Sequence, residues 1–269
     1  MCPGERCGAR NLMAAAVATL ALAAWPGSAC AENPRIAKLR AAEQKTFTDA
    51  QIAEGFFKIA FDAELAVAGR VDRIRKYDAP VRVFVENRAK PDRRRQVADT
   101  VADIAARVEH LDVAMTDDAR AGNVAVKLVR NRALAPTIRA SYGRARARQI
   151  ERSLEPQCLS GFRKDDQYRI VRSEVILVAD AGDFVFYDCA YEELLQALGP
   201  INDDASVPWS MFNDEVSKGF FDVYDQYLLN ILYDPRVRPG MTREEVRALL
   251  PQVLPAVRAF VARVNGIEP

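Results

Sequence analysis

The chain of 269 residues is 49% hydrophobic and 28% charged, which supplies enough apolar sequence for a core and argues against disorder or a coiled coil. Thirty-eight basic residues against 37 acidic ones give a formal charge of +1, which removes the electrostatic footprint of a nucleic-acid-binding protein. His110 is the only histidine. No histidine-based zinc site, Ser-His-Asp triad or Cys-His dyad can therefore be assembled without it.

Residues 1–31 have the pattern of a secretory signal peptide. Basic residues precede an apolar run from Leu12 to Trp25, and a small-x-small cleavage site ends at Ala31. The run is shorter than the roughly 20 residues that span a bilayer, so we expect a soluble periplasmic or secreted chain without a transmembrane helix. A lipid anchor at Cys30 is the competing interpretation, although the branched apolar residue usual three positions upstream is missing.

Cleavage after Ala31 leaves two cysteines, Cys158 and Cys189, in an oxidising compartment. An even pair of cysteines in that setting predicts a disulfide. A reactive thiol is the functional alternative.

The first elements are predicted from helical and alternating apolar spacing. Residues 32–47 are expected to be a linker that precedes a single domain over 48–265. Thr48 and Gln51 form a capping-box pattern at the start of a helix over 49–66. The other predicted elements are a strand over Val81–Asn87 and a helix over Arg93–Val108, whose initial arginines, Arg93 to Arg95, are expected to be solvated.

The middle of the chain is predicted to be rich in strands. Strands are expected at Leu111–Met115, Val124–Val129 and Arg169–Asp180. An arginine-rich, solvated helix is expected at Ala140–Leu154. His110 is expected to be structural or simply exposed, because no second ligand is near it in sequence.

The rest of the chain is predicted to be mostly helical. A motif helix is expected over about 189–199, with Asp188 as its N-cap and Gly199-Pro200 as its end. Helices are also expected over Phe220–Tyr233 and from Thr242 onward. Strands followed by helices indicate an α+β fold, with a sheet-and-helix subdomain over about 48–199 and a helical one over 200–265.

The stretch from Glu192 to Asn202 has the spacing of the metzincin motif H-E-x-x-H-x-x-G-x-x-H, without its histidines. Glu192, Gln196 and Asn202 stand at the ligand positions, Glu193 stands at the position of the general base, and Gly199 is retained. Downstream, Met211 or Phe212 stands where matrixin-type proteases have their Met-turn, and the helix ending at Tyr233 resembles their closing helix. The strand and helix order upstream is also that of zincins. The resemblance implies a zincin-like fold.

More closely, the chain resembles an uncharacterised bacterial family, domain of unknown function 2927, over about residues 48–250. This resemblance implies fold and export but carries no activity. The residues that support it are Gly55-Phe56, Glu64, Pro80-Val81-Arg82-Val83, Cys158, Cys189 to Leu194, Gln196, Leu198-Gly199, Asn202-Asp203, Phe212-Asn213-Asp214, Leu232 to Arg236 and Gly240-Met241.

Loss of all three imidazoles predicts that ordinary zinc proteolysis is absent, since carboxylate and amide oxygens suit calcium, magnesium or manganese better. The favoured hypothesis is a non-proteolytic protein of the cell envelope, without a cofactor or metal, that binds a peptide, a glycan or an envelope protein. One alternative is a metal-dependent hydrolase with oxygen ligands at Glu192, Glu193, Gln196 and Asn202, joined by Asp203. The other is a purely structural or assembly role. Asp203 and Asp204 are otherwise expected to form the loop.

Overall fold

The computed structural model describes residues 32–61, 72–153, 157–200 and 202–268. The expected signal peptide, 1–31, lies outside the described residues. The described part is an α+β structure with one mixed sheet, as the element pattern predicted. None of its helices is long and apolar enough to cross a membrane.

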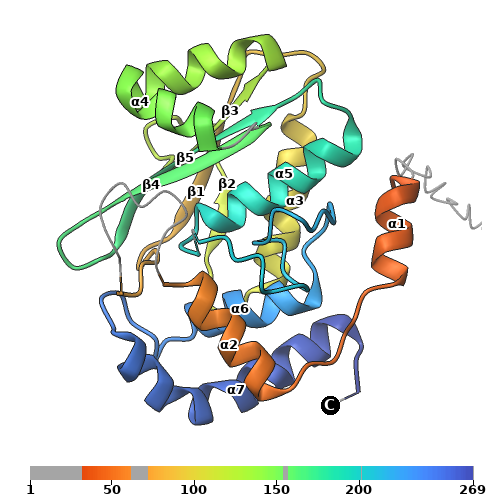
Figure 1. Ribbon diagram of the computed structural model, residues 1–269, viewed down its shortest axis with the longest axis vertical. Coiled ribbons are helices and arrows are strands. Elements are labelled where there is room, and N and C mark those ends of the chain that lie inside the picture. Colours follow the sequence, from red (N-terminus) through yellow and green to blue (C-terminus); the bar gives the residue numbers. More distant parts are fainter. Residues whose placement is uncertain (1–31, 62–71, 154–156, 201, 269) are drawn as a thin grey trace, which may run out of the picture. The chain divides into compact units, whose positions relative to one another are not determined.

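Five strands form the sheet, in the order β2-β1-β3-β5-β4 (Figure 1). All neighbours are parallel except β4, which runs antiparallel to β5 at one edge. Parallel pairing requires crossover connections, and helices provide several of them. The strands are β1 (Val81–Asn87), β2 (Val113–Met115), β3 (Val124–Val129), β4 (Cys158–Lys164) and β5 (Ile170–Val178).

Strand β4 was not predicted from the sequence. Its central residues do not alternate between apolar and polar, because Ser160 faces helix α5 (Asp183–Gln196) while Gly161 faces helix α4 (Asn131–Ser153). A strand covered on both faces lacks the period-two pattern that identifies a half-exposed one. The sequence therefore indicated only three of the four strands that follow β1.

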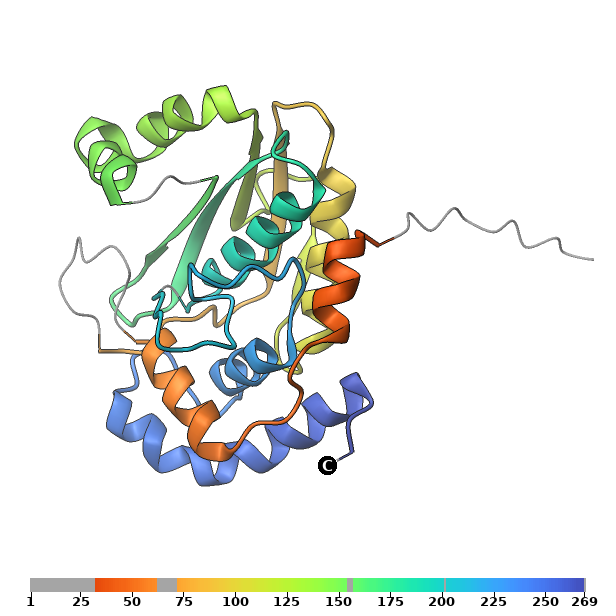
Figure 2. The same cartoon turned by 45° about the vertical axis from the view of Figure 1, so that its right-hand side comes forward.

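Helices cover both faces of the sheet (Figures 1 and 2). Buried residues of β3, β4 and β5 pack against α4 in one apolar cluster that includes Leu159 and Ile176. The other face packs against α5 and helix α3 (Arg94–Arg107) within the larger core. The alternation of side chains along each strand thus divides the interior into two cores.

Helix α4 is longer than predicted. It begins at Asn131 rather than Ala140, and it is broken at Gly143, where φ is 76° and ψ is 163°. Glycine adopts this backbone conformation without the steric cost that a side chain would add. Pro136 inside the first half obscured the helical pattern, because proline normally ends or kinks a helix.

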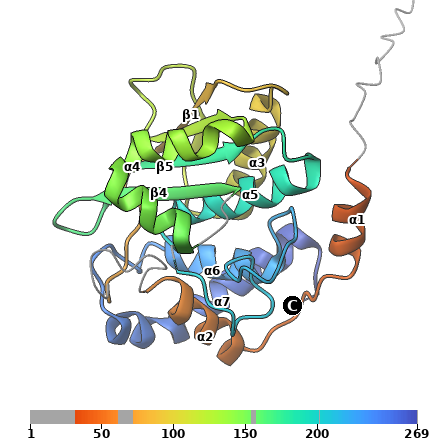
Figure 3. The same ribbon diagram turned by 45° about the horizontal axis from the view of Figure 1, so that its top comes forward.

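The remaining helices are α1 (Pro34–Ala41), α2 (Asp49–Ile59), α6 (Val223–Tyr233) and α7 (Arg243–Asn265). Helices α2, α6 and α7 lie together beyond the sheet, whereas α1 lies apart from them, with Arg35 over the ring of Phe184 in α5 (Figure 3). Capping boxes at Thr48 and Thr242 begin α2 and α7, which confirms both predicted starts. The helix predicted over 49–66 ends at Ile59, and its last predicted residues fall partly outside the described ones. The expected linker contains a short helix, α1.

Candidate functional site

Helix α5 carries the metzincin-like spacing, and two contacts fix it to its surroundings. The predicted disulfide between Cys158 and Cys189 is present and joins α5 to strand β4. At the start of the helix, the Arg93 guanidinium forms an ion pair with Asp183, and its Nε donates to the carbonyl of Ala179 at 3.1 Å. Arg93 is therefore buried, which corrects the expectation of a solvated arginine run; Arg94 and Arg95 are exposed.

Asp188 lies inside α5, so its predicted role as N-cap is wrong. The helix begins five residues earlier, at Asp183. The Asp188 carboxylate instead accepts hydrogen bonds from the backbone amides of Lys218 and Gly219, at 2.6 and 2.9 Å. Burial raises the pKa of this carboxyl. Asp188 thus ties the loop that follows the motif back onto the motif helix.

Three carboxylates meet beside α5. The helix contributes Glu192, and the loop that follows it contributes Asp203 and Asp214. One carboxylate oxygen of each residue lies within 4.8 Å of those of the other two. Burial raises the pKa of Glu192 well above its ordinary value, and the charges of Glu193 and Asp203 add to this effect. We call these three residues the acidic cluster.

Gln196 occupies a ligand position of the motif but is held by hydrogen bonds at both ends of its amide. Its Oε1 accepts from the Ser160 hydroxyl of β4 at 3.1 Å, and its Nε2 donates to both oxygens of Asp203, at 3.1 and 3.2 Å. The side chain is 5% exposed. The glutamine therefore connects the edge strand to the loop.

The other two polar motif positions do not join the cluster in the expected way. Glu193 is buried, 6% exposed, one helix position round from Glu192. Asn202 donates from Nδ2 to the carbonyl of Lys58 at 2.8 Å, which anchors the loop to the end of α2. Of the expected oxygen-ligand residues, Glu192 and Asp203 therefore converge, and Asp214, which the sequence did not indicate as a ligand, joins them in the acidic cluster.

Gly199 is required by a close approach. Its φ is 143°, and a Cβ at this position would lie 2.4 Å from the carbonyl oxygen of Arg75. No side chain fits there without displacing backbone. The glycine of the motif is thus explained by packing at the end of the helix, whatever the chemistry beside it.

Met211 and Phe212 are core residues. Both are buried, at 3% and 0% exposed. Their turn is held by Asp225 of α6, whose carboxylate accepts from the Ser210 hydroxyl at 2.6 Å and from the Met211 amide at 2.8 Å. Burial raises the pKa of Asp225 well above its ordinary value. Sequence analysis did not single out this residue, although a carboxylate within a mostly apolar helix was the available signal.

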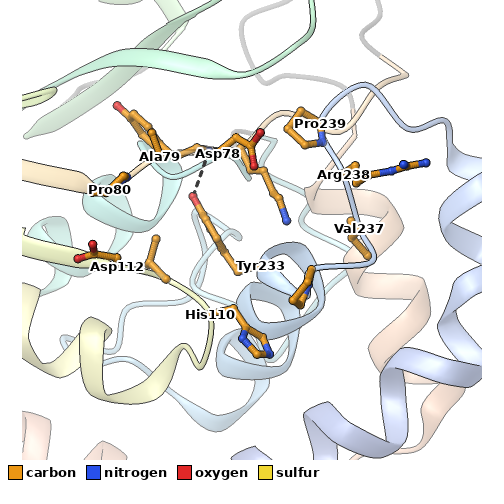
Figure 4. Close-up of a pocket in the computed structure, with 13 residues that line it drawn as sticks. Asp78, Ala79, Pro80, His110, Asp112, Tyr233, Val237, Arg238 and Pro239 are labelled. Atoms are coloured by element: carbon orange, nitrogen blue, oxygen red, sulfur yellow. Dashed lines mark hydrogen bonds between the residues drawn. The ribbon is translucent and has the colours of Figure 1, made fainter.

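His110 belongs to a different part of the molecule (Figure 4). It lines a cavity of about 370 Å³ together with Lys76 and Tyr233. In this view Asp78 and His110 lie on opposite sides of Tyr233, whose hydroxyl accepts from the Tyr77 amide at 3.4 Å. Lys76 Nζ donates to the carbonyls of Leu232 and Asp234, at 2.9 and 3.2 Å, and burial lowers the pKa of its amine to about 8.

The donors beside α5 do not fit a catalytic zinc ion. The acidic cluster offers only carboxylate oxygens, which are hard ligands and suit Ca²⁺, Mg²⁺ or Mn²⁺. The glutamine at the second ligand position is engaged by Ser160 and Asp203. No step of zinc-dependent hydrolysis follows from this arrangement.

Fold and site together define an α+β protein in which a disulfide joins the motif helix to an antiparallel edge strand. The acidic cluster lies between this helix and the loop that follows it. The chain belongs to the family described as protein of unknown function (DUF2927), whose model matches residues 49–252. Among curated proteins, none matches the chain. Family membership confirms the resemblance to this family that the sequence indicated, and it assigns no activity.

Proposed function

We propose that this chain is an exported, non-proteolytic binding protein of the bacterial cell envelope with a zincin-like fold. The order β1, α3, β2, β3, β5, α5 supports the zincin resemblance, with α4 and β4 inserted before β5. The pattern of residues 1–31 supports export. The disulfide between Cys158 and Cys189 fits an oxidising compartment.

One observation carries the non-proteolytic part of the proposal. The motif position that would hold the second imidazole is occupied by Gln196, whose amide is hydrogen-bonded at both ends to other parts of the protein. A ligand to a metal must direct a lone pair at the ion. The Gln196 oxygen instead accepts from the Ser160 hydroxyl, and the amide nitrogen donates to Asp203, so the contacts present at this position favour packing of β4, α5 and the loop.

The proposed ligand is an extended peptide segment. Strand β4 is one of the two edges of the sheet among the described strands, opposite β2, and it lies beside α5. Edge strands present backbone donors and acceptors that an added peptide strand can pair with. Peptide binding of this kind needs no metal and no nucleophile, which agrees with the side chains present.

A test combines selection with mapping. Peptides selected from a random library on the purified mature chain should protect amides of residues 158–164 from hydrogen exchange and should be recovered uncleaved. Failure to select any peptide, or protection confined to other elements, would contradict peptide binding. Zinc-dependent cleavage that is lost in Glu193→Gln would contradict the non-proteolytic part. Export is checked separately by sequencing the N-terminus of the mature protein, which should begin at Glu32.

The acidic cluster favours a second candidate, a metal-dependent hydrolase with a divalent cation held by carboxylates. Three carboxylate oxygens within 4.8 Å of one another repel unless a proton or a cation lies between them. Elemental analysis of protein purified without chelator tests this candidate. One equivalent of Ca²⁺, Mg²⁺ or Mn²⁺, lost in Glu192→Gln but retained in the control Glu215→Gln at an exposed position, would establish the cation. A metal-free protein would eliminate it.

A further inference from the structure

A second candidate site lies on the opposite face of the sheet, beneath the break in helix α4. A cavity of about 420 Å³ opens there between α4 and the β4–β5 pair. The residues that line it and enter the argument are Tyr142, Arg146, Gly161, Arg163, Arg172 and Glu174. None of them was singled out as a site residue by the sequence. Gly161 and Arg163 belong to β4, whose backbone edge is the proposed peptide-binding element, but the cavity lies on the face of the strand that packs against α4.

Two polar atoms here are buried without a hydrogen-bond partner in the described part of the chain. They are the hydroxyl of Tyr142 and Oε1 of Glu174. The other oxygen of Glu174 is paired with Lys127 Nζ at 2.5 Å, and the same ammonium donates to the Ser141 hydroxyl at 3.0 Å. A buried donor and a buried acceptor that lack partners are uncommon in native proteins and call for a bound group that supplies them.

Backbone placement brings these two groups together. Gly161 of β4 lies directly opposite Glu174 of β5 in the strand register, so both face α4. A Cβ on Gly161 would lie 2.8 Å from the Tyr142 hydroxyl oxygen. The missing side chain is therefore what admits the tyrosine hydroxyl beside Glu174. Burial and the charge of Glu174 raise the pKa of Tyr142, so its hydroxyl stays a donor at neutral pH.

The mouth of the cavity is basic. Arg163 and Arg172 are directly opposite each other on β4 and β5, and like charges in that position disfavour strand pairing. The Arg146 guanidinium lies 5.5 Å from the centre of the Tyr142 ring. All three arginines are exposed, and the ion pairs found among the described residues include none of them. A bound anion would relieve this repulsion.

We propose that this cavity binds a sugar acid, such as a uronic acid unit of an acidic glycan. Its carboxylate pairs with the guanidinium groups at the mouth, as planar forked donors favour. Its hydroxyl groups donate to Glu174 Oε1 and accept from the Tyr142 hydroxyl. A simple anion would satisfy only the arginines and would be repelled by Glu174. A neutral sugar would leave the arginine pair unrelieved.

The test uses calorimetric titration of the mature chain with tri-galacturonic acid, maltotriose and inorganic phosphate. We expect tri-galacturonic acid to bind at least tenfold more tightly than either of the others. Equal binding of phosphate and the acidic trisaccharide would show attraction of anions to a basic surface and would overturn the proposal. Absence of binding to tri-galacturonic acid would overturn it as well.

Two variants and one control locate the site. Arg172→Gln and Tyr142→Phe should each weaken tri-galacturonic acid binding at least fivefold, whereas Arg132→Gln, at an exposed position of α4 outside the cavity, should leave it unchanged. The Tyr142→Phe variant should be as stable as the parent, because the hydroxyl that it removes has no partner in the described protein. Equal weakening in Arg132→Gln, or unchanged binding in Tyr142→Phe, would contradict the assignment.

Discussion

The two faces of the sheet differ in how their buried polar side chains are hydrogen-bonded. On the α5 face, Gln196, which stands at a ligand position of the metzincin-like spacing, is hydrogen-bonded within the protein, and acidic groups lie beside it. On the α4 face, the Tyr142 hydroxyl and one Glu174 oxygen are buried without hydrogen-bond partners among the described residues, beneath exposed arginines. Packing therefore accounts for the glutamine at this position of the motif. The Tyr142 and Glu174 atoms that lack partners among the described residues lie instead on the α4 face, where no sequence motif indicated a site.

Strand β4 contacts helices on both faces of the sheet, so removal of the disulfide that fixes it should lower stability more than any other change considered. The disulfide from Cys158 to Cys189 closes a loop with a sequence separation of 31 residues. The chain-entropy relation gives about 3–4 kcal/mol for a loop of this size. Replacing both cysteines by alanine should lower the free energy of unfolding by that amount, as measured by urea denaturation. A loss below about 1 kcal/mol would show that β4 is held by other contacts.

On the α5 face, Gln196→Leu should be the next most damaging change. It removes the acceptor of the buried Ser160 hydroxyl and one donor to Asp203. Leaving a buried hydroxyl unpaired costs about 1–3 kcal/mol. The matched control is Gln252→Leu at an exposed position, which should change stability little. If Gln196→Leu were neutral in denaturant unfolding, the glutamine would not be the structural connection described.

Glu192→Gln should stabilise the protein at neutral pH in the presence of chelator. Burial and neighbouring carboxylates raise the pKa of Glu192 in the native state. The free-energy cost of ionising this buried carboxyl is therefore absent below the ordinary glutamate pKa, and it lowers stability as pH rises through the native pKa. The gain in melting temperature should be small at pH 4 and reach about 2–4 °C at pH 8, the shift for a change near 1 kcal/mol. A variant that melts lower at pH 8 would contradict this assignment.

Tyr142→Phe on the α4 face should have the smallest effect on stability. The hydroxyl that it removes has no hydrogen-bond partner in the described structure, so unfolding should change by less than about 0.5 kcal/mol, in either direction. The difference between the free-energy changes of Tyr142→Phe and Gln196→Leu therefore measures the difference between the two faces. A loss as large as that of Gln196→Leu would mean that the tyrosine hydroxyl is structurally engaged.

Local signals in the sequence predicted many of the elements. Capping boxes at Thr48 and Thr242 set helix starts correctly, and alternation identified β1 and β3. Strand β4 was missed because both of its faces are covered, and the start of α4 was missed because Pro136 interrupts its pattern. Periodicity reports exposure on one side, so it fails where both sides are buried.

The candidate site was predictable only along the motif helix. Spacing selected Glu192 and Gln196, but it could not show that Asn202 turns to the carbonyl of Lys58 or that Asp214 approaches Glu192. Those contacts depend on the path of the loop after Gly199, which tertiary packing determines. The Tyr142 cavity depends on the register of β4 with β5, and sequence alone did not indicate that β4 exists.

The most direct test of the central claim, that the motif positions now serve structure and hold no metal, is a thermal-unfolding titration at pH 7.5. The parent chain and Glu192→Gln are each melted with chelator and with millimolar Zn²⁺, Ca²⁺, Mg²⁺ or Mn²⁺. The account predicts that no cation raises the melting temperature of the parent chain and that the variant melts higher throughout. A cation-dependent rise in the parent chain that disappears in Glu192→Gln would contradict it.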